Sequence, residues 1–304
     1  MARMPATVCV LALVCATSAR GTDIKAEEAK LAAAGQQIQE QFAKWRAQGA
    51  SGAVAFRTLD GEAEYHYSAD APFPAGGTIK LPTLIAVFRQ LDEGRLHLAE
   101  PLFVHNQFSS VFDGSPFQVY REDDSETGLY KAEGKTRTIG ELCELMITAE
   151  SKFATNLLIQ KVELDNIRAT VLSLNAENMR VLRSFGDEKA TTQGRLLNTT
   201  TVRTLQTLMT AMLEGKAASR EGSAMMIGML ERRHVSDGIS AGLPAETRVA
   251  QQTGTMPGIQ LKVDSAIVYA PRPFVLVIRT VRIPESDSAA LMANITRLLY
   301  QAVE

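Results

Sequence analysis

The chain has 304 residues, of which 45% are hydrophobic and 22% are charged, and its formal net charge is −2. That length admits one large domain or two interleaved ones, and the composition is typical of a globular protein with a sizeable core. Without a basic excess, nucleic acid is a poor candidate partner. Pairs such as Arg232-Arg233 are interpreted as solvated helix surface.

Residues 1–19 have the layout of a secretory signal peptide. Arg3 precedes an apolar run over 7–16, and small residues follow that run up to Ala19. Because the run is too short to span a bilayer, we expect cleavage near Ala19; an N-terminal membrane anchor is the alternative. The mature chain, 20–304, is therefore predicted to be periplasmic or secreted, without a stable membrane span.

The N-terminal part of the mature chain is predicted to form a helix and then a strand hairpin. The helix covers 23–48, where apolar residues share one face. Two alternating segments around Asp60-Gly61 predict the hairpin strands, 53–58 and 64–67. A loop over 72–77 then leads into a helix at about 78–93, which Gly94 closes.

The middle of the chain is predicted to be helical. Residues 105–135 show no clear period and are interpreted as a long loop with short helical pieces. Thr138 and Glu141 then form a capping box. Helical apolar patterns follow at 139–149, 152–162, 164–174, 201–214 and 222–232.

Strands return near the C-terminus. Alternation is weak from Arg248 to Gly258 and strong in the last two predicted strands, 265–270 and 274–281, before an amphipathic helix at 287–303. We therefore expect an α/β (α+β) fold with one antiparallel sheet made from N- and C-terminal segments and flanked by helices. An all-helical subdomain, about 76–244, is inserted into a sheet subdomain of about 20–75 and 245–304. A functional site is expected at the seam between the two.

Cysteine and histidine patterns indicate neither a disulfide nor a metal site. Cys9 and Cys15 lie in the predicted signal peptide, which leaves Cys143 alone in the mature chain. Cys143 lies in a helical apolar pattern, so a buried, inert thiol is expected rather than a catalytic one. No metal-ligand spacing is present, and no cofactor is expected.

The segment FPAGGTIKLP over 73–82 resembles the first motif of the class A β-lactamase and penicillin-binding serine-hydrolase superfamily. That motif is Ser-x-x-Lys at the start of a long helix. The helix N-terminus favours negative charge, and a lysine three residues later lies on the same face. In this chain Lys80 occupies the lysine position and Gly77 occupies the serine position.

Three further segments resemble the family in the same order. The run LMITAESKFATNLLI over 145–159 resembles the second-motif helix, but the family's Ser-Asp-Asn or Ser-Ser-Asn reads Glu150-Ser151-Lys152. The run VAQQTGTMPG over 249–258 resembles the third motif, with Lys-Thr-Gly changed to Gln252-Thr253-Gly254. The segment RSFGDEKA over 183–190 resembles a family segment that carries a glutamate, which aligns with Gly186. This ordered set covers most of 50–300 and implies the family fold.

The substitutions argue against the family's acyl-enzyme chemistry. Glycine has no side chain, so no acyl group can be attached at Gly77. Thr78 is the alternative nucleophile, but one residue along a helix turns a side chain by about 100° away from the site. The resemblance implies that Glu150 replaces a proton-shuttling serine, that Lys152 replaces a carboxamide, and that Gln252 removes a cation. It also implies that the deacylating base is missing at Gly186.

Some of these residues are expected to form a charge cluster in the former active site. A buried lysine needs a partner, so we predict a Lys80–Glu150–Lys152 cluster, with a solvent-facing Glu150 as the alternative. The resemblance also implies retained ligand-binding groups. These are the backbone N–H groups of Gly77 and Thr255, the Thr253 hydroxyl and the Lys262 cation.

Together these observations predict a secreted β-lactamase-fold pseudoenzyme that binds a small carboxylate, a β-lactam, a peptide or a peptidoglycan-like ligand. One alternative is an active hydrolase of β-lactams or esters that uses atypical residues. The other is a structural or interaction module whose cleft is closed by side chains. Covalent labelling by penicillin distinguishes the first alternative, and ligand-induced stabilisation distinguishes the second.

Overall fold

The computed structural model describes the backbone from residue 9 to residue 304 and the side chains from residue 25 onward. The predicted signal peptide, 1–19, lies outside the residues whose side chains are described, so its cleavage stays a prediction. Within the described part of the chain, no helix is both long enough and apolar enough to cross a membrane.

A five-stranded antiparallel sheet joins the two ends of the chain. Its order is β2-β1-β11-β10-β9. The strands are β1 (Ser51–Thr58), β2 (Glu64–Tyr67), β9 (Arg248–Met256), β10 (Leu261–Tyr269) and β11 (Phe274–Val281). Because β1 pairs with β11 along its whole length, the N- and C-terminal segments form one sheet. This arrangement confirms the predicted fold class.

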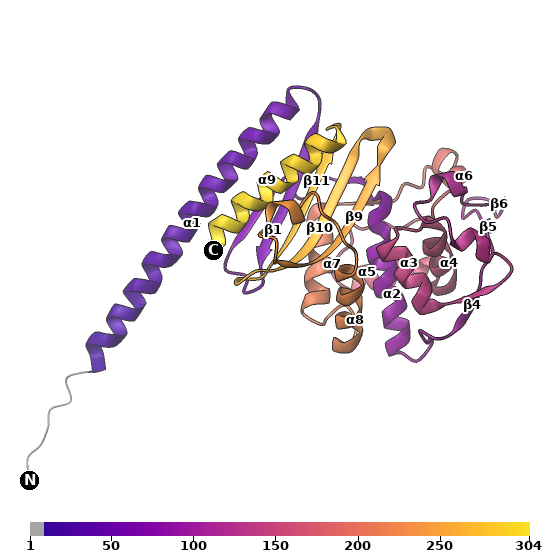
Figure 1. The fold of residues 1–304 in the computed structure, drawn as a ribbon, viewed down its shortest axis with the longest axis horizontal. Coiled ribbons are helices and arrows are strands. Elements are labelled where there is room, and N and C mark those ends of the chain that lie inside the picture. Colours follow the sequence, from indigo (N-terminus) through magenta and orange to yellow (C-terminus); the bar gives the residue numbers. More distant parts are fainter. Residues whose placement is uncertain (1–8) are drawn as a thin grey trace, which may run out of the picture.

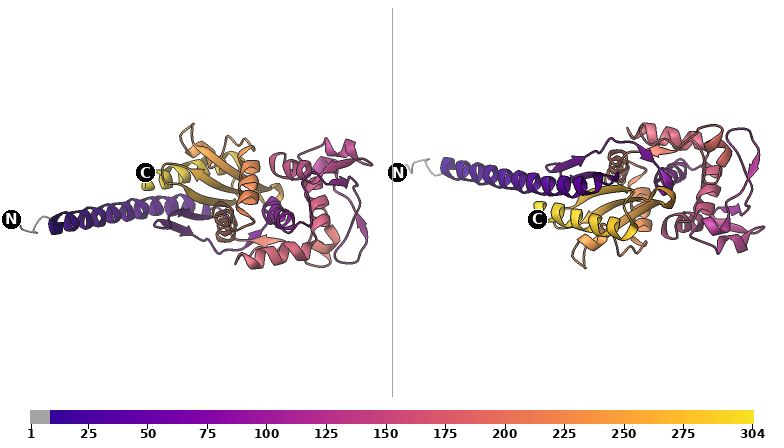
Figure 2. Two further views of the ribbon diagram at one scale, coloured as in Figure 1. Left: turned by 90° about the horizontal axis from the view of Figure 1, so that it is seen from below. Right: turned by 90° about the horizontal axis from the view of Figure 1, so that it is seen from above.

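Two terminal helices cover one face of this sheet. α1 (Cys9–Arg46) and α9 (Glu285–Val303) lie side by side on it, and the N-terminal end of α1 extends past the sheet (Figures 1 and 2). The strands carry apolar residues towards both faces in alternation. In β1, Val54 and Phe56 pack towards these helices, while Ala53 and Ala55 face the opposite core.

The remaining helices form the body at the other side of the sheet (Figure 1). They are α2 (Lys80–Asp92), α3 (Ile139–Thr148), α4 (Lys152–Val162), α5 (Leu164–Ser173), α6 (Glu188–Thr192), α7 (Val202–Leu213) and α8 (Arg220–Glu231). Short two-stranded pairs accompany them: β3 (Phe73–Pro74) with β8 (Thr199–Thr200), β4 (Pro101–Phe103) with β7 (Thr136–Thr138), and β5 (Phe108–Ser109) with β6 (Pro116–Phe117). α7 also packs on β1, β10 and β11, so the inserted segment helps to cover the sheet.

The predictions of local structure are confirmed where they rest on a helix-capping motif or on a strong apolar periodicity. Thr138 and Glu141 form the predicted capping box at the start of α3. Cys143 is fully buried, and burial raises the pKa of its thiol, as expected for an inert cysteine. The helix expected from residue 78 instead begins as a 3₁₀ turn, η1 (Gly76–Ile79), and becomes α-helical only at Lys80.

Candidate functional site

Gly77 lies in the 3₁₀ turn η1, where β9 crosses the start of α2. A Cβ atom at Gly77 would lie 3.2 Å from the Gly254 Cα and 3.6 Å from Glu150 Oε2. Gly76 has a positive φ of 50°, which turns the chain into η1 against the Thr255 carbonyl. The Gln252 amide donates to the Gly77 carbonyl at 3.2 Å. The third predicted motif therefore does lie against the first.

Lys80 and Glu150 form a buried ion pair next to Gly77. The Lys80 side chain is 2% exposed, and its Nζ donates to Glu150 Oε2 and to the Glu150 carbonyl, both at 2.9 Å. Burial lowers the pKa of Lys80 below its usual value, and the adjacent carboxylate opposes that shift. The predicted contact between the first and second motifs is present, and Glu150 does not point to solvent.

Arg233 is the third member of this cluster. It follows α8 and donates to Glu150 Oε1 and, at 2.5 Å, to the Thr253 hydroxyl. Its side chain is only 13% exposed, whereas the neighbouring Arg232 lies at the surface and pairs with Glu144. The sequence interpretation of both arginines as solvated surface was therefore right for Arg232 and wrong for Arg233.

Lys152 is not part of the cluster, contrary to prediction. Its Nζ donates to the Asp123 carbonyl at the surface. Lys152 is the first residue of α4, and its backbone N–H is held at 2.8 Å by Asp124, which also accepts from the Phe153 N–H at 2.9 Å. This attachment places the Lys152 side chain beside the 121–124 turn, so Arg233 rather than Lys152 is the second cation beside Glu150.

Two hydroxyl groups close to the cluster already form hydrogen bonds with backbone groups. Ser151 is buried; its Oγ accepts from the Ala154 N–H as the N-cap of α4 and donates to Asp124 at 3.2 Å. The Thr78 hydroxyl donates to the Ala75 carbonyl at 2.6 Å, and its side chain is fully buried. Neither hydroxyl is free to act as a nucleophile in this arrangement.

Phe185, rather than Gly186, is the residue of its loop that approaches Lys80. The Phe185 ring centroid is 6.0 Å from Lys80 Nζ, and the Phe185 backbone is clamped by the Asn156 amide at 2.8 and 2.9 Å. Gly186 is exposed, has a φ of 79°, and faces the Gln118 carbonyl. The position aligned with the family glutamate, Gly186, therefore does not face Lys80, because the loop turns outward there.

The remaining predicted ligand groups lie on β9 and β10. Gln252 is fully buried and also donates to the Thr253 carbonyl. Lys262 lies opposite Thr255 in the β9–β10 register, but its Nζ pairs with Asp237. Its charge is thus already balanced, while the Thr253 hydroxyl is joined to the cluster through Arg233. Within the described residues, no group of histidine, cysteine or acidic side chains is placed to hold a metal ion.

The residues that sequence reasoning missed come from segments without a periodic signal. Asp124 lies in the 105–135 loop, and Arg233 lies just after the last turn of α8. Phe185 lies in a loop, and the sequence did not indicate which residue it would contact. Each reaches the site only because distant segments meet at the seam between the sheet and the helical body.

An antiparallel sheet flanked by terminal helices, with a lysine-bearing helix starting at the seam, defines the class of β-lactamases and penicillin-binding proteins. A family model described as the Beta-lactamase enzyme family matches residues 33–303, and the chain belongs to this family of hydrolases. A β-lactamase of Streptomyces fradiae is 27% identical over 268 residues, which cover 83% of this chain and 81% of the relative. A β-lactamase of Streptomyces albus G is 27% identical over 269 residues, or 85% and 82% of the two chains.

Solved structures show the same fold. The structure of PBP-A has a TM-score of 0.74 and 26% identity over 89% of this chain and 95% of that one. A mutant of PBP-A, solved as an acyl-enzyme complex with penicillin G, is equally similar, with a TM-score of 0.74. A β-lactamase from Sphaerobacter thermophilus, 24% identical over 87% of this chain and 95% of that one, has a TM-score of 0.73.

Proposed function

We propose that this chain is a periplasmic or secreted pseudoenzyme of the β-lactamase family, which binds a ligand at the former active site and is not acylated by it. The observation that carries the proposal is the absence of a side chain at Gly77, just before α2. Gly77 stands there without a hydroxyl group, and the Glu150 carboxylate lies 3.6 Å from where its Cβ would be. An acyl-enzyme needs an oxygen or sulfur nucleophile at that point.

The surrounding groups support the loss of chemistry. The Lys80 ammonium donates to two Glu150 acceptors, so it has no free lone pair with which to take a proton from a nucleophile. Thr78 and Ser151 are committed to backbone contacts. The aromatic ring of Phe185 stands over Lys80, where a carboxylate would be needed to activate water.

Charge supports a binding role for a carboxylate, a peptide end or a cell-wall-like fragment. The cluster contains two cations, Lys80 and Arg233, and one carboxylate, Glu150. The surplus positive charge would attract an anionic group to the Arg233 and Thr253 side. A ligand carboxylate there would compete with Glu150 for the guanidinium.

Mass spectrometry of the intact protein tests the catalytic half of the proposal. After exposure to benzylpenicillin, a cephalosporin and a carbapenem, we expect no mass increase, and no hydrolysis of a chromogenic cephalosporin. The Streptomyces albus G β-lactamase is the positive control for hydrolysis. A covalent adduct, or turnover, on the purified wild-type protein would establish an active hydrolase instead.

Thermal shift measurements test the binding half. Short peptides that end in a free carboxylate should stabilise the protein more than the same peptides with an amidated end. Arg233→Gln should remove that difference, whereas Arg232→Gln at the adjacent surface position should keep it. Equal shifts for both peptide forms in the wild type would contradict recognition of the carboxylate, and no shift with either form would favour the closed, purely structural module.

A further inference from the structure

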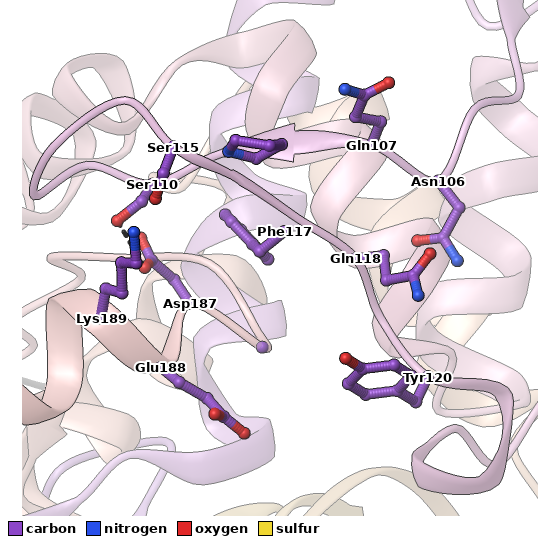
Figure 3. Close-up of a pocket in the computed structure, with 12 residues that line it drawn as sticks. Asn106, Gln107, Ser110, Ser115, Phe117, Gln118, Tyr120, Asp187, Glu188 and Lys189 are labelled. Atoms are coloured by element: carbon purple, nitrogen blue, oxygen red, sulfur yellow. Dashed lines mark hydrogen bonds between the residues drawn. The ribbon is translucent and has the colours of Figure 1, made fainter.

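A pocket lies beside the cluster, on the outer side of the Phe185 loop. Its volume is about 490 Å³, within the usual range of about 300–1,000 Å³ for small-molecule sites. One wall is the β5–β6 hairpin and the residues after it, and the other is the turn that opens α6 (Figure 3). Gly186 lines this pocket, while the preceding residue, Phe185, contacts Lys80.

The walls of the pocket are held in place by buried polar contacts. Asn106 makes two hydrogen bonds of 2.9 Å with the Val119 backbone, which fixes the segment after β6. Asp187 is 1% exposed and accepts from Ser110 Oγ at 2.7 Å, the Val111 N–H at 2.9 Å and the Ala190 N–H at 3.1 Å. A site whose walls are already ordered loses little conformational entropy when a ligand binds.

Glycine is required where the two walls meet. Gly186 has a φ of 79°, and a Cβ there would lie 3.1 Å from the Gln118 carbonyl. The glycine therefore lets the turn approach the hairpin closely and sets the width of the pocket at this end.

The groups left free to meet a ligand are neutral, with one exception. Lys189 forms an ion pair with Asp113 at 3.0 Å. The Asp187 carboxylate already accepts three hydrogen bonds from protein groups. Glu188 is exposed, and its carboxylate has no hydrogen-bond or ion-pair partner among the described residues. The pocket therefore carries one unpaired negative charge and would repel an anionic ligand, in contrast to the cluster beside it.

The free neutral groups are side-chain amides and an aromatic ring. Gln118 and Tyr120 line the pocket from the hairpin side, where the Tyr120 ring extends towards the open space and the residue is 52% exposed (Figure 3). Gln107 adds a second exposed amide at the rim. An amide both donates and accepts, and a carboxylate accepts with two oxygens. Such groups match neighbouring hydroxyls on a sugar ring, while the tyrosine ring offers an apolar face to its C–H groups.

We propose that this pocket binds a saccharide that is uncharged or carries amines. Gln118 and Glu188 hydrogen-bond its hydroxyl or amine groups, and Tyr120 stacks against a ring face. The site acts independently of the Lys80–Glu150–Arg233 cluster, so it does not require that the cluster bind anything.

Titration of the purified protein with four probes tests this assignment. The probes are the trimers of N-acetylglucosamine, glucosamine, glucose and galacturonate. Calorimetry and saturation-transfer NMR measure the binding of each trimer. We expect at least one neutral or amine-bearing trimer to bind in the micromolar to millimolar range, and galacturonate to bind at least tenfold more weakly. Tyr120→Ala and Gln118→Ala should each weaken binding at least fivefold, and Glu188→Gln should reduce the discrimination against galacturonate.

Matched substitutions outside the pocket provide the controls. Tyr300→Ala on α9, Gln160→Ala on α4 and Glu221→Gln on α8 should bind the trimers as the wild type does. Absence of binding by every trimer at millimolar concentration would overturn the proposal, as would binding that is unchanged in Tyr120→Ala and Gln118→Ala. Binding of a tetra-alanine peptide in place of the trimers, lost in the same two variants, would assign the pocket to a peptide instead.

Discussion

Lys80 Nζ lies 2.9 Å from Glu150 Oε2, in a pair where the lysine side chain is 2% exposed and the glutamate side chain 19%. Glu150 also has a positive φ of 59°, an unusual conformation for a residue other than glycine. Because a strained backbone persists only where its surroundings hold it, the Lys80 and Arg233 contacts explain how Glu150 is kept there. The pair is thus the central element of the charge cluster beside Gly77.

Removal of the Glu150 carboxylate should destabilise the protein strongly. Glu150→Ala leaves two nearly buried cations without their shared partner, and breaking a buried pair in this way costs roughly 3–5 kcal/mol. Urea unfolding at pH 7 measures the loss. Glu93→Ala, which breaks the exposed pair with Arg95, is the control and should cost less than about 1 kcal/mol. Equal losses in the two variants would show that the buried pair has no special role.

Arg233 and Arg232 should differ sharply although they are adjacent in sequence. Arg233→Gln removes the donor that joins Glu150 to Thr253, and we expect a loss of about 2 kcal/mol in the free energy of unfolding. Arg232→Gln breaks an exposed pair with Glu144 and should cost less than about 1 kcal/mol. The same urea titrations compare both variants, and the prediction fails when Arg232 proves the more costly substitution.

Restoring a serine at the head of α2 should not restore turnover. Gly77→Ser adds a Cβ at 3.2 Å from Gly254 Cα, a tight contact that requires the Gly254 backbone to shift by a few tenths of an ångström. The new hydroxyl would face Glu150 instead of a free lysine amine, so hydrolysis of a chromogenic cephalosporin should stay at background. Rescue by this single change would show that Glu150 and Gln252 do not matter.

A fourfold variant should regain acylation but not turnover. Gly77→Ser, Glu150→Ser, Lys152→Asn and Gln252→Lys together rebuild the three family motifs. Phe185, which cannot activate water, still lies beside Lys80. We therefore expect mass spectrometry to detect a penicillin adduct that persists for hours. A variant that remains unlabelled, or one that hydrolyses penicillin rapidly, would contradict this expectation.

Because of Asp264, the protein should be more stable in mild acid than at neutral pH. Burial raises the pKa of this carboxyl from 3.8 to about 6, although the Ile239 N–H and Gln251 amide oppose the shift. The folded state then binds more protons than the unfolded state between about pH 4 and 6, so this group's contribution falls as pH rises through 6. The shift corresponds to about 3 kcal/mol.

Asp264→Asn removes that titration. Relative to the wild type, its free energy of unfolding should increase by about 2 kcal/mol between pH 4.5 and pH 7.5, as measured by urea unfolding at both values. Asp165→Asn is the control, because the Asp165 side chain is 84% exposed. A difference between wild type and Asp264→Asn that does not change with pH would refute the assignment.

The fold could be predicted from the sequence wherever residue periodicity matches burial. β11 and the second half of β10 are rich in buried apolar residues, and they were predicted as strands over 274–281 and 265–270. The first half of β10 was not predicted, because the buried Lys262 and Asp264 interrupt its apolar pattern. β9 was less clear because two buried polar residues, Gln251 and Gln252, interrupt its alternation. The two-residue strands β5 and β6, which form a wall of the pocket beside the Phe185 loop, are too short to show a periodic pattern.

By itself, the sequence determined the fold class, the missing hydroxyl at Gly77 and the meeting of Lys80 with Glu150, because these follow from local pattern and motif order. Only the tertiary structure decided which cation shares Glu150, which aromatic ring covers Lys80, and how Asp124 holds α4 and the nearby Lys152. Those partners come from segments far apart in the chain. Periodicity indicates which face of an element is buried, but not which distant side chain packs against it.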